Sequence, residues 1–210
     1  MPNLSLTPAH ADTQRREPSP TPAYDDTPKV AKWGFGGINT VSLFNFTYND
    51  TVLAYDGVTK IVAPGTGGVV NFRMESGVSE VDSKIDFTIT ETNAGAIPIV
   101  YQVGTNYYSS VLAPGSVYLK KHGEAALSEV TITGNLAAMG TYLSSLPFAT
   151  VGAGKNYSTA VGTVNWFWAF ESDATNDTGA DTSDPALGTA AADGSAIVTL
   201  NVSVKAVQID

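Results

Sequence analysis

Apolar and polar side chains alternate along this chain from residue 38 onwards, and this alternation limits the fold more than any other feature of the sequence. The clearest stretch is Ser195–Ile209, where apolar residues from Ala196 to Val204 occupy every second position. Lys84–Thr90 repeats the pattern. A period of two is typical of β-strands with one buried and one wet face. Such strands need a second layer against their apolar face, so a layered β-structure is expected.

Shorter stretches rich in β-branched and aromatic residues indicate further strands. They are Thr40–Phe46, Val58–Val62, Val69–Met74, Ile97–Val103, Val117–Lys120, Glu129–Thr133 and Val161–Phe170. Turns containing Gly and Pro, at Ala63–Gly68 and Ala113–Gly115, separate several of them. The only stretch with helical spacing is Asn135–Leu146, which Pro147 ends. The expected fold is therefore all-β, an antiparallel β-sandwich with one short inserted helix.

The N-terminal region differs in composition from the rest, because residues 1–30 hold six of the chain's 11 prolines. Proline removes a backbone donor and fixes φ, so residues 1–22 are expected to be a disordered, Pro-rich leader. Residues 23–37 are interpreted as an extended segment and residues 38–210 as the folded domain. The first residues lack the charged start and apolar run of a secretory signal. A cytoplasmic chain and a mature or altered form of an exported chain both explain this, and the second is preferred.

The charge balance limits the classes of partner. Acidic residues outnumber basic ones by 20 to 11, which gives a net charge of −9. Binding to nucleic acid or to an anionic membrane surface requires clustered cations, so neither is an expected partner. No apolar run reaches the ~18 residues of a transmembrane helix, so no membrane span is predicted.

Cysteine and histidine, on which much nucleophilic and metal-dependent catalysis relies, are scarce. The chain has no cysteine and two histidines, His10 and His122. Without cysteine there is no disulfide, thiolate nucleophile or cysteine-ligated metal. His122 follows two lysines and precedes a glycine, which is typical of an exposed turn. Sites that need several imidazoles are therefore excluded, and no catalytic residue is predicted.

An acidic loop and a tryptophan-containing strand are the remaining candidates for a ligand site. The loop Glu171–Leu187 carries Asp173, Asp177, Asp181 and Asp184, whose oxygens suit Ca²⁺, although the ligand order of an EF-hand is missing. A solvated acidic loop without a cofactor is the alternative, and it is preferred. Trp166 and Trp168 share one face and could stack on sugars, but strand alternation favours a place in the core. Candidate N-glycosylation sites are Asn45, Asn49, Asn156, Asn176 and Asn201.

Five segments, taken in order, resemble the TasA/camelysin family of secreted β-sandwich proteins. They are Ala23–Leu43, which begins Ala-Tyr-Asp-Asp-Thr-Pro-Lys, then Ile61–Phe72, Ser83–Asn93, Val164–Gly188 and the terminal Val207–Asp210. The fourth is the most specific, because Val-Asn-Trp-Phe-Trp-Ala-Phe-Glu precedes two Asp-Thr pairs and a Leu-Gly. Residues 1–22 depart from the family, in which a signal peptide precedes the position of Ala23.

The resemblance implies a jelly-roll sandwich that is exported to the cell surface or the biofilm matrix. Members of this family form fibres in which an extended N-terminal segment of one subunit completes a sheet of the next, by donor-strand complementation. Residues 23–37 are then the donor segment. Its apolar contacts are Tyr24, Val30, Trp33 and Phe35. The implied partner is another copy of this chain, bound head to tail. The alternative is an ordinary first strand that pairs within its own sandwich.

The resemblance also carries a peptidase label, which belongs to camelysin. The residues available for a metal site are His122 and the carboxylates from Asp173 to Asp184, and one histidine on a basic turn does not make a catalytic zinc site. The leading hypothesis is therefore a structural, non-enzymatic subunit of an extracellular, pilus-like filament. A metal-dependent surface peptidase and a surface binding module stay open as alternatives.

Overall fold

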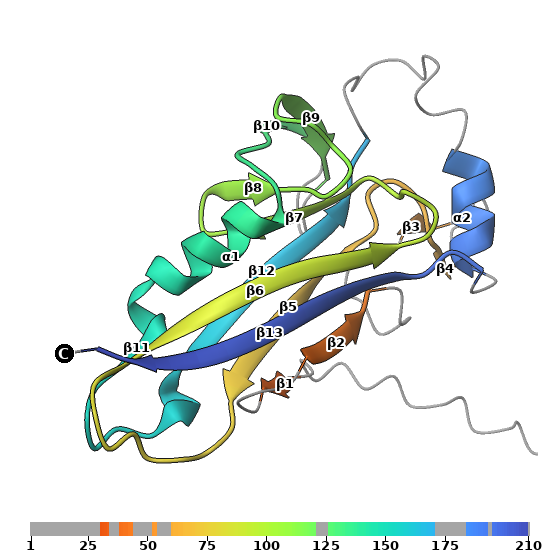
Figure 1. The fold of residues 1–210 in the computed structure, drawn as a ribbon. Coiled ribbons are helices and arrows are strands. Elements are labelled where there is room, and N and C mark those ends of the chain that lie inside the picture. Colours follow the sequence, from red (N-terminus) through yellow and green to blue (C-terminus); the bar gives the residue numbers. More distant parts are fainter. Residues whose placement is uncertain are drawn as a thin grey trace, which may run out of the picture.

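The structure, a computed structural model, describes residues 30–33, 38–43, 52–53, 60–120, 126–170, 184–192 and 195–209. Its strands are β1 (Val30–Trp33), β2 (Ile38–Ser42), β3 (Val52–Leu53), β4 (Lys60–Ile61), β5 (Gly67–Met74), β6 (Ser83–Asn93), β7 (Ile99–Val103), β8 (Asn106–Tyr108), β9 (Ser116–Leu119), β10 (Ser128–Thr131), β11 (Thr150–Val151), β12 (Val161–Trp168) and β13 (Val198–Gln208). The α-helices in this part of the chain are α1 (Leu136–Ser145) and α2 (Asp184–Ala192), and Pro147–Ala149 and Tyr157–Thr159 form 3₁₀ turns. Figure 1 shows α1 along one side of the strands and α2 near one end.

Two sheets contain the main strands. The order in one is β1-β5-β12-β7-β8, and in the other β11-β6-β13-β2. The chain changes sheet between β5, β6 and β7, and again between β11, β12 and β13. Without β1, this order is that of an eight-stranded jelly roll. The predicted all-β, antiparallel jelly-roll sandwich is therefore confirmed. Among the described strand pairs, β1 with β5 is the parallel exception.

The longest strand pair is β6 with β13, which runs from Ser83 opposite Gln208 to Asn93 opposite Val198. Buried and more exposed residues alternate along both strands for most of their length, as the sequence predicts. The inward residues include Ile85, Phe87, Ile89, Leu200, Val202 and Val204. These two strands therefore supply the inner face of one sheet to the core between the sheets.

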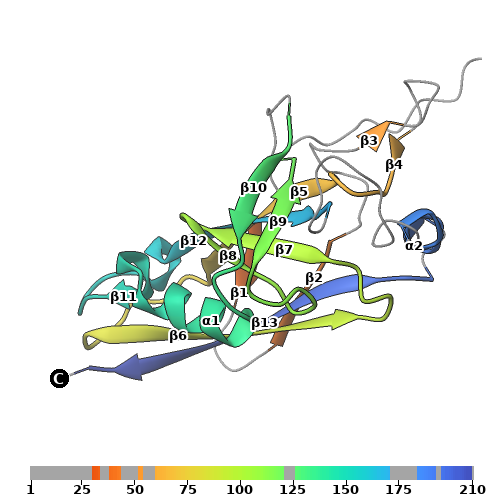
Figure 2. The ribbon, with the colours of Figure 1, turned by 90° about the horizontal axis from the view of Figure 1, so that it is seen from above.

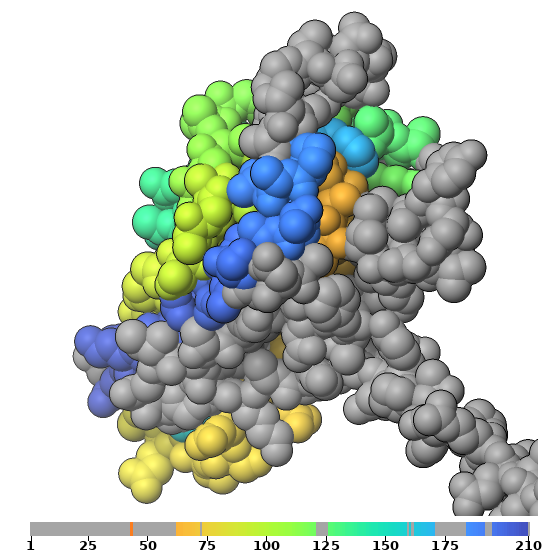
Figure 3. All heavy atoms as spheres, turned by 90° about the vertical axis from the view of Figure 1, so that its right-hand side faces the viewer, coloured from red at the N-terminus to blue at the C-terminus, as the bar shows by residue number. Residues whose placement is uncertain are grey.

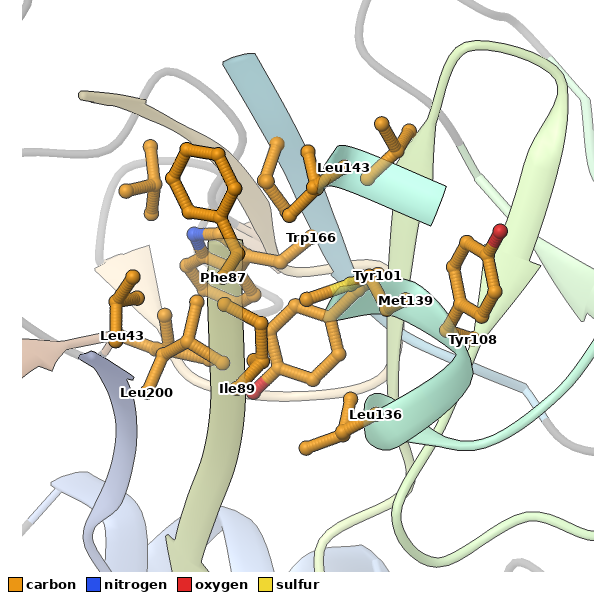
Figure 4. Close-up of a cluster of buried hydrophobic side chains, with 14 of the residues drawn as sticks. Leu43, Phe87, Ile89, Tyr101, Tyr108, Leu136, Met139, Leu143, Trp166 and Leu200 are labelled. Carbon is orange, nitrogen blue, oxygen red and sulfur yellow. The ribbon is translucent and has the colours of Figure 1, made fainter. Parts of the chain in front are cut away.

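The core lies between the two sheets and is lined by large side chains. Figure 4 shows side chains from β6, β7, β12 and α1 in one cluster, among them Phe87, Tyr101, Met139 and Trp166. Tyr101, Met139, Trp166 and Trp168 are fully buried. The prediction that the two tryptophans belong to the core is confirmed.

The end of strand β12, Trp166–Trp168, is buried on both faces, which the alternation did not predict. Phe167 points away from the tryptophans, yet it is buried in a second apolar cluster with Val100, and that cluster includes residues of β9 and β10. The backbone N–H of Phe170 donates to the carbonyl of Tyr118 at 2.8 Å and ties the hairpin to the sheet. Figure 2 shows the β9–β10 hairpin on the side of β7 and β12 that faces away from β6 and β13. The hairpin is therefore a third layer over part of the sandwich.

Helix α1 closes the edge of β6. The helix begins after Asn135, whose side-chain oxygen accepts a hydrogen bond from the N–H of Ala138 at 3.0 Å. Because β11 pairs with only the first two residues of β6, the edge beyond it needs another cover. Ser144 of α1 supplies it, since its hydroxyl accepts a hydrogen bond from the N–H of Phe87 at 2.8 Å. A helix over an open strand edge blocks the addition of another strand there.

Helix α2 corrects the sequence-based interpretation, which placed Asp184 in a loop and expected a single helix. Asp184 instead begins α2, with Pro185 in its first turn, where proline fits a helix well. Figure 3 shows α2, in blue, over residues that follow Val62, in orange. A β-carbon at Gly188 would lie 2.6 Å from the carbonyl oxygen of Val62, so this contact requires glycine. No helix in the described ranges is long and apolar enough to cross a membrane.

Candidate functional site: the β1–β5 edge

Strand β1 contains two of the four predicted donor residues, Val30 and Trp33, whereas Tyr24 and Phe35 lie outside the described residues. It pairs in parallel with the last half of β5, with Val30 opposite Asn71 and Trp33 opposite Met74. The segment predicted to complete a sheet therefore completes one here, within its own chain.

The attachment of β1 is narrow. In the described part of the chain, β1 is an outermost strand and has β5 as its one strand neighbour, over four residue pairs. Parallel pairing is slightly less stable per residue than antiparallel pairing. The backbone groups at the outer edge of β5 need some partner, but this pairing does not require that the partner come from the same chain.

The opposite side of the sandwich is covered at β8 and along β6. At the β8 edge, the N–H of Thr133 donates to the carbonyl of Tyr107 at 2.6 Å, and the N–H of Ser109 donates to the carbonyl of Gly134 at 3.2 Å. At the β6 edge, α1 takes the place of a further strand. Both N-terminal strands, β1 and β2, lie instead at the other side, one at the edge of each sheet. Strand addition to the sandwich is therefore directed to the β1–β2 side.

The predicted cation loop is only partly described. Asp173, Asp177 and Asp181 lie outside the described residues, and Asp184 is a buried residue in the first turn of α2. A carboxylate there is favoured by the positive end of the helix dipole. Among the described residues, no group of three or more His, Cys, Asp or Glu side chains could hold a metal ion. Both histidines lie outside these residues.

The candidate sugar platform and glycosylation sites are placed as follows. Trp166 and Trp168 are fully buried, so neither indole offers a face for stacking on a sugar.

Asn156 caps the second 3₁₀ turn, and its side-chain oxygen accepts from the N–H of Ser158 at 2.9 Å. Asn201 lies in the middle of β13 and donates to the hydroxyl of Thr92 at 3.3 Å. The remaining candidates, Asn45, Asn49 and Asn176, lie outside the described residues.

Sequence reasoning missed a partly buried polar cluster that is centred on Glu91. Glu91 of β6 accepts hydrogen bonds from the hydroxyls of Tyr101 and Ser110 and, at 2.9 Å, from the amide of Asn93. Burial, then the charge of Glu91 and its hydrogen bond, raise the pKa of Tyr101 well above the ordinary 10.0. The sequence did hold a sign of this cluster, because the charged residue Glu91 occupies an inward position of the alternating strand β6. The cluster joins one sheet to the other.

Comparison of the sequence with known proteins does not identify a family for this chain. No protein-family model matches the sequence, and no curated protein matches it.

Proposed function

We propose that this chain is the structural subunit of an extracellular filament, at the cell surface or in a biofilm matrix, assembled by donor-strand complementation. The observation that carries the proposal is the place of β1, a short parallel strand that covers the edge of β5 and is not otherwise part of the jelly roll. We place the chain with the TasA/camelysin family on the segments that resemble it. In this role it has no catalytic residue and needs no cofactor.

Exchange of β1 between subunits preserves its contacts. The same four residue pairs with β5 form whether β1 comes from the same chain or from another copy. The equilibrium between the self-paired and the exchanged forms is therefore set by subunit concentration and by strain in the connection between β1 and β2. It is not set by new bonds. That connection, residues 34–37, is short, and short hinges favour exchange.

The rest of the sandwich supports linear growth. The β8 and β6 edges are covered, so the β1–β2 side is where a neighbour can add. A strand given to one neighbour and received from another is a head-to-tail contact, which does not close on itself and extends as a filament. The absence of cysteine means that non-covalent contacts such as strand pairing, not disulfides, hold such subunits together.

Two single-cysteine variants of the full chain test the exchange directly. Lys32 lies opposite Arg73 across the β1–β5 pair. Paired residues on neighbouring strands lie about 5 Å apart, which suits a disulfide. Lys32→Cys on a tagged chain and Arg73→Cys on an untagged chain are mixed, unfolded, refolded together and oxidised. Because the natural sequence has no cysteine, any crosslink comes from the introduced pair.

The expected result is a disulfide-linked heterodimer, the largest disulfide-linked species that two single-cysteine chains can form, together with filaments in negative-stain electron microscopy. The matched control pairs Lys32→Cys with Thr90→Cys, an exposed residue on the other sheet, and gives no heterodimer. A mixture that stays monomeric, with a disulfide forming only when both cysteines are in one chain, would show a self-complemented strand and refute the proposal.

A further inference from the structure

One end of the sandwich exposes apolar side chains. This surface, here called the β5–β6 pole, comprises the loop Glu75–Asp82 and Ile209 at the end of β13, at the lower left of Figure 1. Val78 is 63 % exposed, the highest value among the large hydrophobic residues that are described as exposed, and Val81 and Ile209 are each 39 % exposed. Exposed apolar side chains gathered in this way are typical of an interaction site.

Hydroxyl groups hold the loop from within. The buried Ser79 hydroxyl lies 2.9 Å from that of Ser83 and 2.8 Å from the hydroxyl of Tyr157. The N–H of Ser79 also donates to the carbonyl of Lys155 at 2.9 Å, and the N–H of Gly154 donates to the carbonyl of Ser79 at 2.7 Å. The loop is therefore anchored to residues far away in the sequence.

Further bonds fix the residues around the exposed valines. Val78 forms a β-bridge with Asn156. The carboxylate of Asp82 accepts from the N–H of Ala153 at 2.7 Å, and its carbonyl accepts from the N–H of Ile209 at 2.9 Å. Apolar groups held in place before binding lose little conformational freedom when they bind, so the pole is suited to a stable contact.

The direction of β1 brings a donor subunit to this pole. Because β1 runs parallel to β5, its last residue, Trp33, lies opposite Met74, and Glu75 begins the pole immediately afterwards. The next strand of the donor, β2, begins at Ile38, so five Cα–Cα steps connect the two strands. Fully extended, five steps span at most about 18 Å.

This reach is short compared with the size of a subunit. A folded domain of this length has a radius of gyration of about 15 Å, and so a diameter of about 40 Å. A donor whose Ile38 lies within about 18 Å of its own Trp33, which is opposite the acceptor's Met74, has its body against the end of the acceptor. The acceptor surface at that end is the β5–β6 pole.

We propose that the β5–β6 pole binds the body of the donor copy, on the donor's β2 side; this inference rests on the proposed function. Valine and isoleucine side chains form the centre of the contact, and exposed carboxylates surround it, from Glu75, Glu80 and Asp82. On the donor, β2 begins opposite Ser203, two residues from the exposed Lys205. This lysine supplies positive charge facing the acidic border.

The test uses the full chain with Val78→Glu, and separately Val81→Glu, in case one variant misfolds. The control is Val111→Glu, because Val111 is also an exposed valine, at 41 %, but lies between β8 and β9, away from the pole. Far-UV circular dichroism and thermal unfolding check that each variant folds. Mean filament length is measured by electron microscopy. A photoreactive phenylalanine analogue at position 78 or 111 then reports which surface touches a second copy.

The pole variants are expected to shorten filaments about tenfold or more, since a buried unpaired carboxylate opposes the contact. The analogue at position 78 crosslinks to a second copy near Ile38–Ser42 or Lys205, and the analogue at position 111 does not. Filaments of normal length with Val78→Glu and Val81→Glu, and no crosslink from position 78, overturn the pole contact while leaving strand exchange intact. Loss of the Lys32–Arg73 heterodimer in the unaltered background instead overturns the proposed function, and the pole contact with it.

Discussion

Gly140 of α1 occupies a position where a β-carbon does not fit. A β-carbon there would lie 2.6 Å from the carbonyl oxygen of Phe87, well inside ordinary contact. Helix propensity alone predicts that Gly140→Ala stabilises the protein by about 1 kcal/mol. Against this, the added methyl group overpacks the contact and forces the helix away from β6. Overpacking of this kind costs about 1–3 kcal/mol. The same movement stretches the hydrogen bond from Phe87 to Ser144, and an unsatisfied buried N–H costs about 1–3 kcal/mol.

The opposing contributions leave a net destabilisation of about 3 kcal/mol, or a fall in Tm of about 6–12 °C for a domain of this size. Urea unfolding followed by circular dichroism measures it. Gly77→Ala is the matched control, because its β-carbon would meet Tyr157 at an ordinary 3.7 Å, and it should change stability by less than about 0.5 kcal/mol. If Gly140→Ala is as stable as the unaltered protein or more stable, α1 does not lie tightly on the β6 edge.

Three further predictions concern the same edges and the core. Ser144→Ala should lower the unfolding free energy by about 1–3 kcal/mol in urea titration, because it removes the buried hydroxyl that accepts from the N–H of Phe87, whereas Ser145→Ala, at an exposed position, should change it little. Burial raises the pKa of Tyr101 above 10.0, so the folded state keeps this proton when the unfolded state loses it. The unfolding free energy that this difference contributes below pH 10.0 should then be lost as the pH rises beyond that value. In urea titrations across this pH range, Tyr101→Phe should make the unfolding free energy decline less steeply. A chain that starts at Gly37 should form no filaments in negative stain under conditions where the full chain does; filaments of both would exclude β1 as the donor.

The sequence was most informative where local chemistry and burial agree. The alternation of β6 and β13 predicted both strands and their inward faces, because each strand has one wet face. Asn135 and Pro147 marked the ends of α1, because capping and the loss of a donor act locally.

Tertiary contacts explain what the pattern missed. Helix α2 is rich in alanine and has no clear apolar stripe, so its Asp-Pro start was the one local signal. Phe167 is buried because a hairpin far away in the sequence covers it, and a nearly continuous apolar run was the available signal. The sequence pattern also could not predict which strand β1 pairs with, because β1 and its partner residues in β5 lie about forty positions apart.

A sandwich closed on one side and open on the other has a defined valence in the proposed assembly. Each chain carries one strand to give and one edge to receive, as the lone β1–β5 pair indicates. In the language of polymer chemistry, this is an AB monomer: chains grow without branching, and their two ends differ chemically. Added free donor peptide, residues 24–36, then acts as a chain stopper that binds only the receiving end, so filament length can be set by the ratio of peptide to protein.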